Sequence, residues 1–221
     1  MARSKKNHDT NREVLIKIAL ELFLENGYEN TTITQIMKAA NLSKGGMYHY
    51  FTSKEDVLNA VIQFGLQQEA EKLKAKVEAL PVEQKLFGFA QSVDIGDFTR
   101  KLLNYSNDNQ DSIVAYKVLE YNTHLLIPLL TEIIAQGVAA GIYKTANPTE
   151  VSEFCILLVR AIADTNLLPA TDQAGILRRL EVFSKIIITC LEPERAHAEQ
   201  LIQIFKSGMH LSDLEEDDNV E

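Results

Sequence analysis

The stretch LSKGGMYHYFTSKE, residues 42–55, places two adjacent glycines and then the run Tyr-His-Tyr-Phe in what reads as a short helix. Glycine inside a helix costs about 0.8 to 1 kcal/mol relative to alanine, and exposed aromatic side chains lower solubility. A helix used only for packing gains nothing from either feature. The pattern therefore indicates that something outside the core contacts this helix.

A second short helix lies just before this stretch. Thr31 or Thr32 can cap a helix of sequence TITQIMKAA, a short turn follows, and Ser43 can cap the next helix. A longer amphipathic helix is predicted over residues 10–26, with an inward face of Val14, Leu15, Ile18, Ala19, Leu22 and Phe23. Such an arrangement is typical of the helix-turn-helix motif, whose second helix enters the major groove of DNA.

Rotation by 100° per residue sorts the second short helix into two faces. Met47 and Phe51 are the natural core anchors. The opposite face and its flanks hold Gly45, Gly46, Tyr48, His49 and Tyr50. Missing side chains let a backbone approach DNA closely, and tyrosine hydroxyls donate to phosphate oxygens. The helix N-terminus at Ser43 and Lys44 suits a phosphate, and Lys54 can reach the same DNA backbone.

Apolar residues recur at helical spacing along the whole chain, which predicts an all-α fold. We expect a three-helix DNA-binding domain over residues 1–60, of which 1–9 form a flexible basic arm. A larger helical domain for ligand binding and dimerisation follows over 61–210, and an acidic disordered tail over 211–221. Pro128 lies inside the longest predicted helix and should kink or split it.

Composition bounds the class of protein. The chain of 221 residues carries a net charge of -9, but residues 1–60 are nearly balanced, so the excess acid lies beyond the DNA-binding part. No apolar run reaches the roughly 18 residues of a membrane span, and no signal-peptide pattern follows the basic start, so a cytoplasmic location is expected. Cys155 and Cys190 lie in apolar helical patterns and are predicted to be buried thiols. No cofactor or metal is expected.

Two other classes of function compete with DNA binding. The pairs Glu120 and His124, and Glu194 and His197, have the residue types of metal ligands in helical bundles. The second pair lies in a polar run, and no nucleophile elbow, phosphate-binding loop or zinc spacing occurs, so we predict that the protein is not an enzyme. A helical adaptor that has lost DNA binding is the other alternative, and the intact helix-turn-helix pattern argues against it.

Residues 10–62 resemble the DNA-binding domain of the TetR family of bacterial transcriptional regulators. Residues 32–57 follow the family pattern T-x-x-x-I-x-x-x-A-x-[VL]-S-x-G-x-[LM]-Y-x-[HY]-F-x-x-K-[ED]-x-L, except that Val57 stands at its last position and leucine comes one residue later, at Leu58. Tyr50 stands where many members have histidine, and Met37-Lys38 replace a commoner small residue and acid. These departures bear on operator preference rather than on DNA binding.

The resemblance implies a double-stranded DNA operator as partner, with phosphate contacts near the start of the first short helix. Carried over by position, it implies DNA contacts at Thr32, Thr34, Ser43, Lys44, Gly46, Tyr48, His49 and Lys54. It also implies a homodimeric repressor that a small molecule releases from DNA. Repressor is favoured over activator by the resemblance alone.

The part beyond residue 61 supplies candidates for the remaining tasks. The segments 148–168 and 172–190 are apolar over more than one stripe, which favours a homodimer through them, although helices of the same chain could cover them instead. Aromatic and polar residues of a type found in ligand pockets are Phe87, Phe98, Tyr105, Tyr116, Tyr121, His124 and Phe154. An unknown, largely apolar effector would suit them, and so would an ordinary core.

Overall fold

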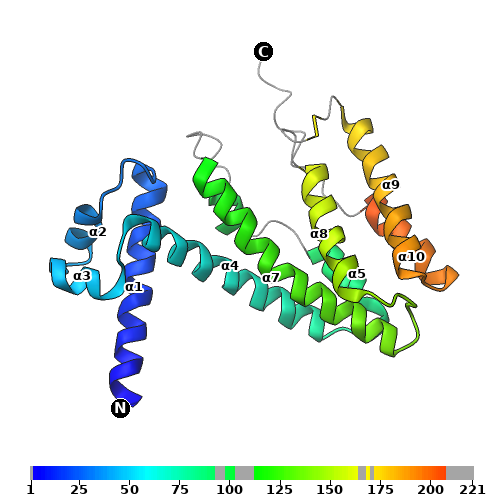
Figure 1. The fold of residues 1–221 in the computed structure, drawn as a ribbon, viewed down its shortest axis with the longest axis horizontal. Coiled ribbons are helices and arrows are strands. Elements are labelled where there is room, and N and C mark those ends of the chain that lie inside the picture. Colours follow the sequence, from blue (N-terminus) through cyan, green and yellow to red (C-terminus); the bar gives the residue numbers. More distant parts are fainter. Residues whose placement is uncertain (1, 93–97, 103–111, 164–167, 170–171, 208–221) are drawn as a thin grey trace. The chain divides into compact units, whose positions relative to one another are not determined.

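The computed structural model describes residues 2–92, 98–102, 112–163, 168–169 and 172–207, and it is built of helices (Figure 1). The helices are α1 (Ala2–Asn26), α2 (Ile33–Ala39), α3 (Lys44–Tyr50), α4 (Lys54–Glu78), α5 (Val82–Ser92), α7 (Ser112–Ala139), α8 (Pro148–Ala163), α9 (Gln173–Leu191) and α10 (Arg195–Ser207). Residues 98–102 are helical as well. Because no strand occurs in these ranges, the predicted all-α fold is confirmed.

The described residues fall into two compact units. The first comprises those within 1–70 and 95–122, and the second those within 71–94 and 123–221. Helices α1, α2 and α3 belong to the first unit, whereas α5, α8, α9 and α10 belong to the second. Helices α4 and α7 each supply residues to both units, so the helix-turn-helix shares its unit with segments that lie far beyond it in sequence.

Helix α1 differs from its predicted extent and face. It begins at Ala2 rather than near Thr10, since no glycine or proline interrupts residues 2–9. Val14, predicted to point inward, is 51% exposed, and Ile16 is buried in its place. Two residues correspond to about 200° around a helix, so both side chains cannot face the same core. The buried stripe is Leu15, Ile16, Ala19 and Phe23.

Helix α7 runs through Pro128 without a break. Proline removes one backbone hydrogen bond and usually disrupts a helix interior. Here Leu126, Leu129 and Leu130 are buried on both sides of the proline, and their packing in the second unit stabilises the helix across it. The predicted possibility that Pro128 splits this helix is therefore wrong.

Two glycines near the end of α7 have different structural reasons, one in packing and one in backbone conformation. A Cβ on Gly137 would lie 2.3 Å from the ring of Tyr143, so only glycine allows this packing. Gly141 has a φ of 76°, a left-handed conformation that glycine adopts readily, and it follows the end of the helix at Ala139. Burial of Tyr143 raises the pKa of its phenol to about 12.

The two cysteines differ, although both were predicted to be buried. Cys155 on α8 is buried, and burial raises the pKa of its thiol to about 12. Cys190 on α9 is exposed, which corrects the prediction. The buried face of α9 contains Leu180, Phe183 and Ile187, at spacings of three and four residues, and Cys190 is one residue short of the next inward position, at Leu191.

Candidate nucleic-acid interface

The first short helix, α2, begins with a reciprocal cap. The Thr32 hydroxyl accepts from the Gln35 N–H at 3.2 Å, and the Gln35 side-chain oxygen accepts from the Thr32 N–H. This capping box identifies Thr32, of the two candidates, as the N-cap. Thr31 is buried instead, and its hydroxyl donates to the carbonyl of Gly27 at 2.7 Å.

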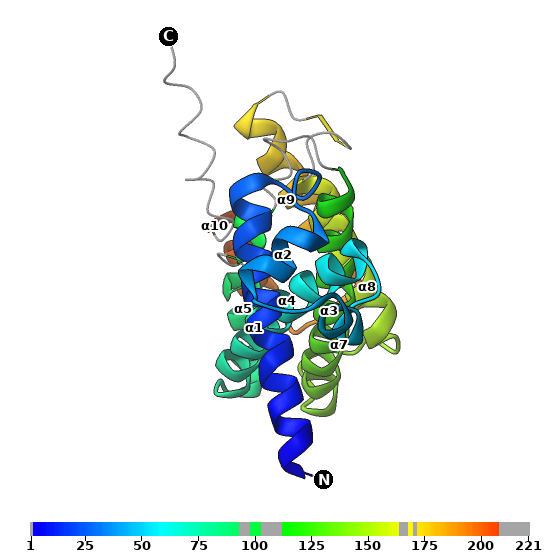
Figure 2. The same ribbon diagram turned by 90° about the vertical axis from the view of Figure 1, so that its left-hand side faces the viewer.

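The recognition helix α3 is fixed by its inward side chains. Met47 and Phe51 are buried, as the rotation argument predicts. Ser43 is the N-cap, because its hydroxyl accepts from the Gly46 N–H at 3.2 Å. Within the first unit, α2 and α3 lie together beside α1, on the side that faces the viewer in Figure 2. Both short helices therefore have defined starts and anchors.

The outward face of α3 has no internal reason for its two glycines. A Cβ on Gly45 would meet nothing within 4 Å, and one on Gly46 would make only ordinary contacts at 3.4 Å. Neither glycine has a positive φ. Beside them Tyr48 is 47% exposed, and the exposed His49 meets Tyr50 edge to face at 5.4 Å. An external surface that approaches the backbone would explain residues that the protein's own packing does not require.

Most of the residues predicted to contact DNA lie on α3 or at its N-cap. Thr32 and Thr34 lie at the start of α2, where Thr34 is exposed and the Thr32 hydroxyl serves the cap. Lys44 is exposed in the first turn of α3. Lys54 differs, since its ammonium lies 2.9 Å from the carbonyl oxygen of Tyr28 in the same unit. Contact of these side chains with DNA stays a prediction.

Helix α4 is also bound to segments of the first unit that lie far beyond it in the sequence. The ammonium of Lys117, on α7, lies 2.9 Å from the carboxylate of Glu55. The carboxylate of Glu69 accepts from the backbone N–H of Phe98 at 2.9 Å and from the hydroxyl of Thr99 at 2.6 Å. Partners so distant in the chain leave no local sequence signal.

The proposed ligand-contacting residues are spread over both units. Phe98, Tyr116 and Tyr121 belong to the first, whereas Phe87, His124 and Phe154 belong to the second. Tyr105 lies outside the described residues. Tyr116 and Phe154 are exposed. The Phe87 ring instead contacts another side chain, since it stacks on the His197 ring with 6.3 Å between the ring centroids. Their common role in a ligand site stays a prediction.

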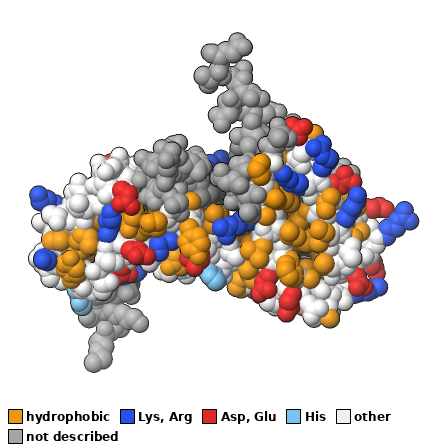
Figure 3. Space-filling view, turned by 45° about the horizontal axis from the view of Figure 1, so that its top comes forward, with side chains coloured by type: hydrophobic (Ala, Val, Ile, Leu, Met, Phe, Trp, Pro, Cys, Tyr) orange, Lys and Arg blue, Asp and Glu red, His pale blue; other side chains and the backbone are white. Residues whose placement is uncertain are grey.

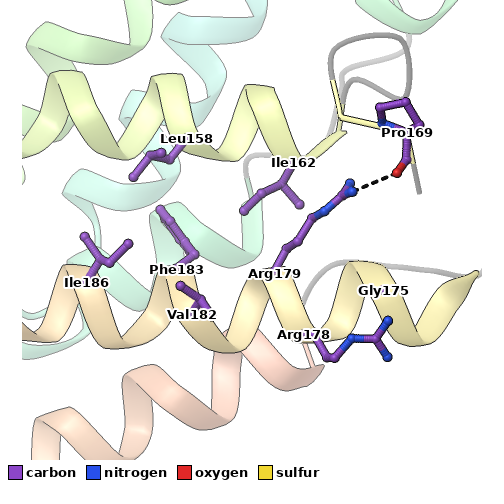
Figure 4. Close-up of a pocket in the computed structure, with 9 residues that line it drawn as sticks. All are labelled: Leu158, Ile162, Pro169, Gly175, Arg178, Arg179, Val182, Phe183 and Ile186. Atoms are coloured by element: carbon purple, nitrogen blue, oxygen red, sulfur yellow. Dashed lines mark hydrogen bonds between the residues drawn. The ribbon is translucent and has the colours of Figure 1, made fainter. Parts of the chain in front are cut away.

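A groove of about 420 Å³ lies between α8 and α9 in the second unit (Figure 4). Its apolar lining comes from Leu158, Ile162, Val182, Phe183 and Ile186, and at one end Arg179 donates to the carbonyls of Leu168 and Pro169. Exposed apolar side chains continue this surface, which we call the α8–α9 face: Phe154, Leu157, Leu177, Val182 and Ile186. Figure 3 shows hydrophobic side chains gathered on the part of the molecule that holds these helices.

Neither a metal site nor a membrane span is found in the described ranges. Within them, no three His, Cys, Asp or Glu side chains are grouped so that they could hold a metal ion. No helix there combines the length and the apolar character needed to cross a bilayer. The paired Glu and His residues that suggested bundle-type metal ligands therefore form no such cluster.

Comparison with known proteins connects this geometry to a family. Residues 15–61 match the model of bacterial regulatory proteins of the TetR family. The chain is 22% identical over 182 residues to the HTH-type transcriptional regulator QacR of Staphylococcus aureus. This alignment covers 79% of this chain and 93% of QacR. It is 37% identical over 75 residues to the HTH-type transcriptional regulator HbdR of Aromatoleum sp., and this alignment covers 33% of each chain.

Solved structures show the same fold. A TetR-family transcriptional regulator from Pectobacterium atrosepticum is 18% identical and superposes with a TM-score of 0.59, covering 84% of this chain and 96% of that one. The fold therefore extends well beyond the residues that match the family model. The matched residues 15–61 include all of α2 and α3 and the first turns of α4.

Proposed function

We propose that the chain is a homodimeric repressor that a small-molecule effector releases from a palindromic operator. The premise is that the chain belongs to the TetR family of bacterial regulatory proteins and is a DNA-binding transcriptional regulator, not an enzyme. We further propose that it acts in the cytoplasm, where its operator would be. Blocking a promoter requires only occupancy of the DNA, which favours repression over activation.

The recognition surface of α3 is the observation that carries this proposal. Met47 and Phe51 anchor the helix in the core, which leaves the opposite face directed outward. That face combines the open space at Gly45 with the exposed side chains of Tyr48 and Lys44. Backbone approach, a phenolic donor and a cation are what contact with phosphates and base edges in a groove requires.

We assign the DNA contacts to the start of α2 and to α3. The proposed contacts are Thr32, Thr34, Ser43, Lys44, Gly45, Gly46, Tyr48, His49 and Tyr50. The N-terminal amides of α3 add a positive dipole end, although the Gly46 amide is already used by the Ser43 cap. Few of these groups are charged, so hydrogen bonds and DNA shape would supply much of the specificity.

The α8–α9 face supports the proposed dimer. Its apolar side chains are exposed within the chain, and an exposed apolar patch of this kind commonly marks a protein interface. A twofold axis would pair α8 and α9 with the same helices of a second copy and bury the face on both. Two recognition helices on such a dimer would read half-sites roughly 34 to 36 Å apart.

The effector that we propose is largely apolar and binds in the helical domain predicted over residues 61–210, with Phe87, Phe98, Tyr105, Tyr116, Tyr121, His124 and Phe154 as candidate contacts. The bonds from Glu55 to Lys117 and from Glu69 to Thr99 tie α4 to segments that follow the helix-turn-helix. Movement of those segments would therefore act on α4, which follows α3 directly. The effector must prefer the form that cannot bind DNA.

Selection of genomic fragments tests the DNA-binding role. Purified protein is mixed with fragmented DNA of the source organism, and a Lys44→Ala/Tyr48→Ala variant with unchanged thermal unfolding is the control. We expect the wild type alone to enrich a palindromic site. If neither protein enriches any fragment at low salt, the repressor proposal is overturned and a helical adaptor is favoured.

A second experiment tests release by an effector. Compounds are screened for those that raise the unfolding temperature of the DNA-free protein, and each is then added to the operator complex. Binding to the form that cannot hold DNA predicts both a higher unfolding temperature and loss of the complex. Compounds that bind the dimer and leave its operator affinity unchanged would contradict the release mechanism.

A further inference from the structure

Lys54 begins α4 directly after the recognition helix, and its ammonium group lies against the turn that follows α1. Its Nζ lies 2.9 Å from the carbonyl oxygen of Tyr28 and 3.2 Å from that of Glu29. The same atom lies 4.3 Å from the centroid of the Tyr28 ring and 4.0 Å from the Glu29 carboxylate. A lysine ammonium has three N–H donors, so two carbonyls and a ring face occupy most of its capacity.

The turn that Lys54 contacts is itself anchored in the core. Tyr28 is buried, and its ring meets the ring of buried Phe23 edge to face at 5.3 Å. Gly27 reverses the chain with a φ of 90°, and the Thr31 hydroxyl donates back to the carbonyl of Gly27 at 2.7 Å. Lys54 therefore binds a defined structure and not a loose loop.

The position of this contact in the chain gives it a mechanical role. The turn at residues 27–31 leads into α2, and Lys54 follows α3, so the contact joins the two ends of the segment that carries both short helices. A charge-assisted hydrogen bond is stronger than a neutral one, and the Lys54 side chain is only 26% exposed. The clamp formed by Lys54 with Tyr28 and Glu29 is thus partly shielded from water.

We propose that Lys54 is a positioning residue that holds α2 and α3 in register for the DNA, and that it is not a phosphate contact. This inference rests on the proposed DNA-binding function and changes the role that the family pattern implies for this lysine. The ammonium would have to leave two carbonyls and an aromatic face before it could bind a phosphate. That loss would offset much of what a new phosphate contact gains.

Other cations of the first unit are used in the same internal way. The guanidinium of Arg12 lies 5.3 Å from the ring centroid of Phe51, and the ammonium of Lys17 lies 6.0 Å from that of Phe64. These groups stabilise the packing of α1. Lys44 is instead exposed on α3, where its charge is available for DNA.

Matched substitutions separate positioning from phosphate contact. Lys54→Met and Lys44→Met remove the same charge and keep a long side chain. Each variant is measured in two ways: hydrogen exchange of the backbone amides in residues 27–32 without DNA, and operator affinity over a series of salt concentrations. Tyr28→Leu serves as a third variant, because it removes the ring face of the clamp and leaves the lysine charge in place.

We expect Lys54→Met to speed amide exchange in the turn about tenfold, and to lower operator affinity about tenfold at every salt concentration without changing the salt slope. Tyr28→Leu should change both readouts in the same direction. Lys44→Met should leave the exchange as in wild type and reduce the salt slope by about one unit per protomer, as loss of a phosphate contact does.

Two results would overturn the assignment. One is wild-type exchange in Lys54→Met together with a salt slope reduced as in Lys44→Met, which would make Lys54 a phosphate contact. The other is wild-type exchange with unchanged affinity, which would leave it no role. If the wild-type protein binds no operator at all, the proposed function fails, yet the exchange measurement still decides whether Lys54 holds the turn.

Discussion

The recognition helix α3 and the α8–α9 face both expose residues that the packing of their own unit does not use, but they expose opposite kinds. Helix α3 presents a glycine in open space, a tyrosine and a lysine. The α8–α9 face presents Val182 and Ile186 from one helix, among other apolar side chains. A polar surface with missing side chains suits a charged polymer at close range, whereas an exposed apolar face suits another apolar face.

Gly137 and Gly45 also differ in whether the packing of the protein itself requires a glycine. Gly137 is required by the Tyr143 ring, which occupies the space of a side chain. Gly45 has no such neighbour, and its helix would be more stable with alanine. An unfavourable residue without an internal cause is a sign of an external one, and this distinction needs the structure.

The largest effect is expected on the α8–α9 face. Val182 is 57% exposed in the single chain, so Val182→Asp should leave the fold intact while placing a charge inside the proposed dimer interface on both copies. An unpaired buried charge costs about 3 to 5 kcal/mol. We expect sedimentation equilibrium to give a dimer for the wild type and a monomer near 24.8 kDa for the variant.

Val14→Asp is the matched control for this experiment. It introduces the same change at a valine that is 51% exposed, but on α1 in the other unit. This variant should remain a dimer. Equal dissociation of both variants would contradict an interface specific to the α8–α9 face. A wild type that is already monomeric would contradict the proposed dimer itself.

The next effect concerns the inward side of α3. Phe51→Ala removes a buried ring and should lower the free energy of unfolding by about 3 to 5 kcal/mol. Chemical denaturation of the purified protein measures it. The matched change on the outward side, Tyr48→Ala, should alter the unfolding free energy by less than about 0.5 kcal/mol. Similar losses in both would mean that the two faces of α3 are not distinct.

Tyr48→Ala should act on the operator instead. Loss of one groove contact typically costs about 1 to 3 kcal/mol, which fluorescence anisotropy with the selected operator would detect as weaker binding. An unchanged unfolding transition of Tyr48→Ala is the control that this variant is folded. Wild-type affinity in this variant would show that the recognition face has been assigned to the wrong side of the helix.

The smallest effect has opposite signs in folding and binding. Gly45→Ala should stabilise the protein by up to about 1 kcal/mol, because alanine is the better helix former and the site is empty. The same methyl group should weaken operator binding by obstructing close approach of the backbone. Gly137→Ala is the counterpart, and it should destabilise the fold because Tyr143 must move. Unchanged operator affinity in Gly45→Ala would contradict the inference that DNA approaches the backbone closely at this glycine.

Thiol labelling checks which way the helices of the second unit face. Burial raises the pKa of the Cys155 thiol to about 12, so it stays protonated and unreactive at pH 8, whereas Cys190 is exposed. We expect iodoacetamide to label Cys190 alone in the folded Val182→Asp monomer, where α9 is not covered by a second copy, and both thiols in denaturant. Raising the pH from 7 to 9 should leave Cys155 unlabelled. Labelling of Cys155 without unfolding would contradict the burial of this face of α8.

The sequence predicted the helix-turn-helix because its signals are local. The caps at Thr32 and Ser43 and the anchors Met47 and Phe51 depend on residues within one or two turns, so spacing alone reveals them. The same reasoning failed where neighbours compete for one core. Val14 has the right residue type but the wrong angular position, and continuous packing overcame the break expected at Pro128.

What the sequence determined by itself is therefore the all-helical class, the recognition motif and its outward residues, since helix periodicity and capping are short-range properties. Only the tertiary structure decided that Gly45 faces open space while Gly137 faces a ring, that Lys54 turns its charge onto Tyr28, and that Lys117 reaches Glu55. These contacts join residues far apart in the chain, and their existence depends on how whole helices pack. No pattern along the sequence encodes that geometry, because each side chain is locally free to turn toward solvent or toward a partner.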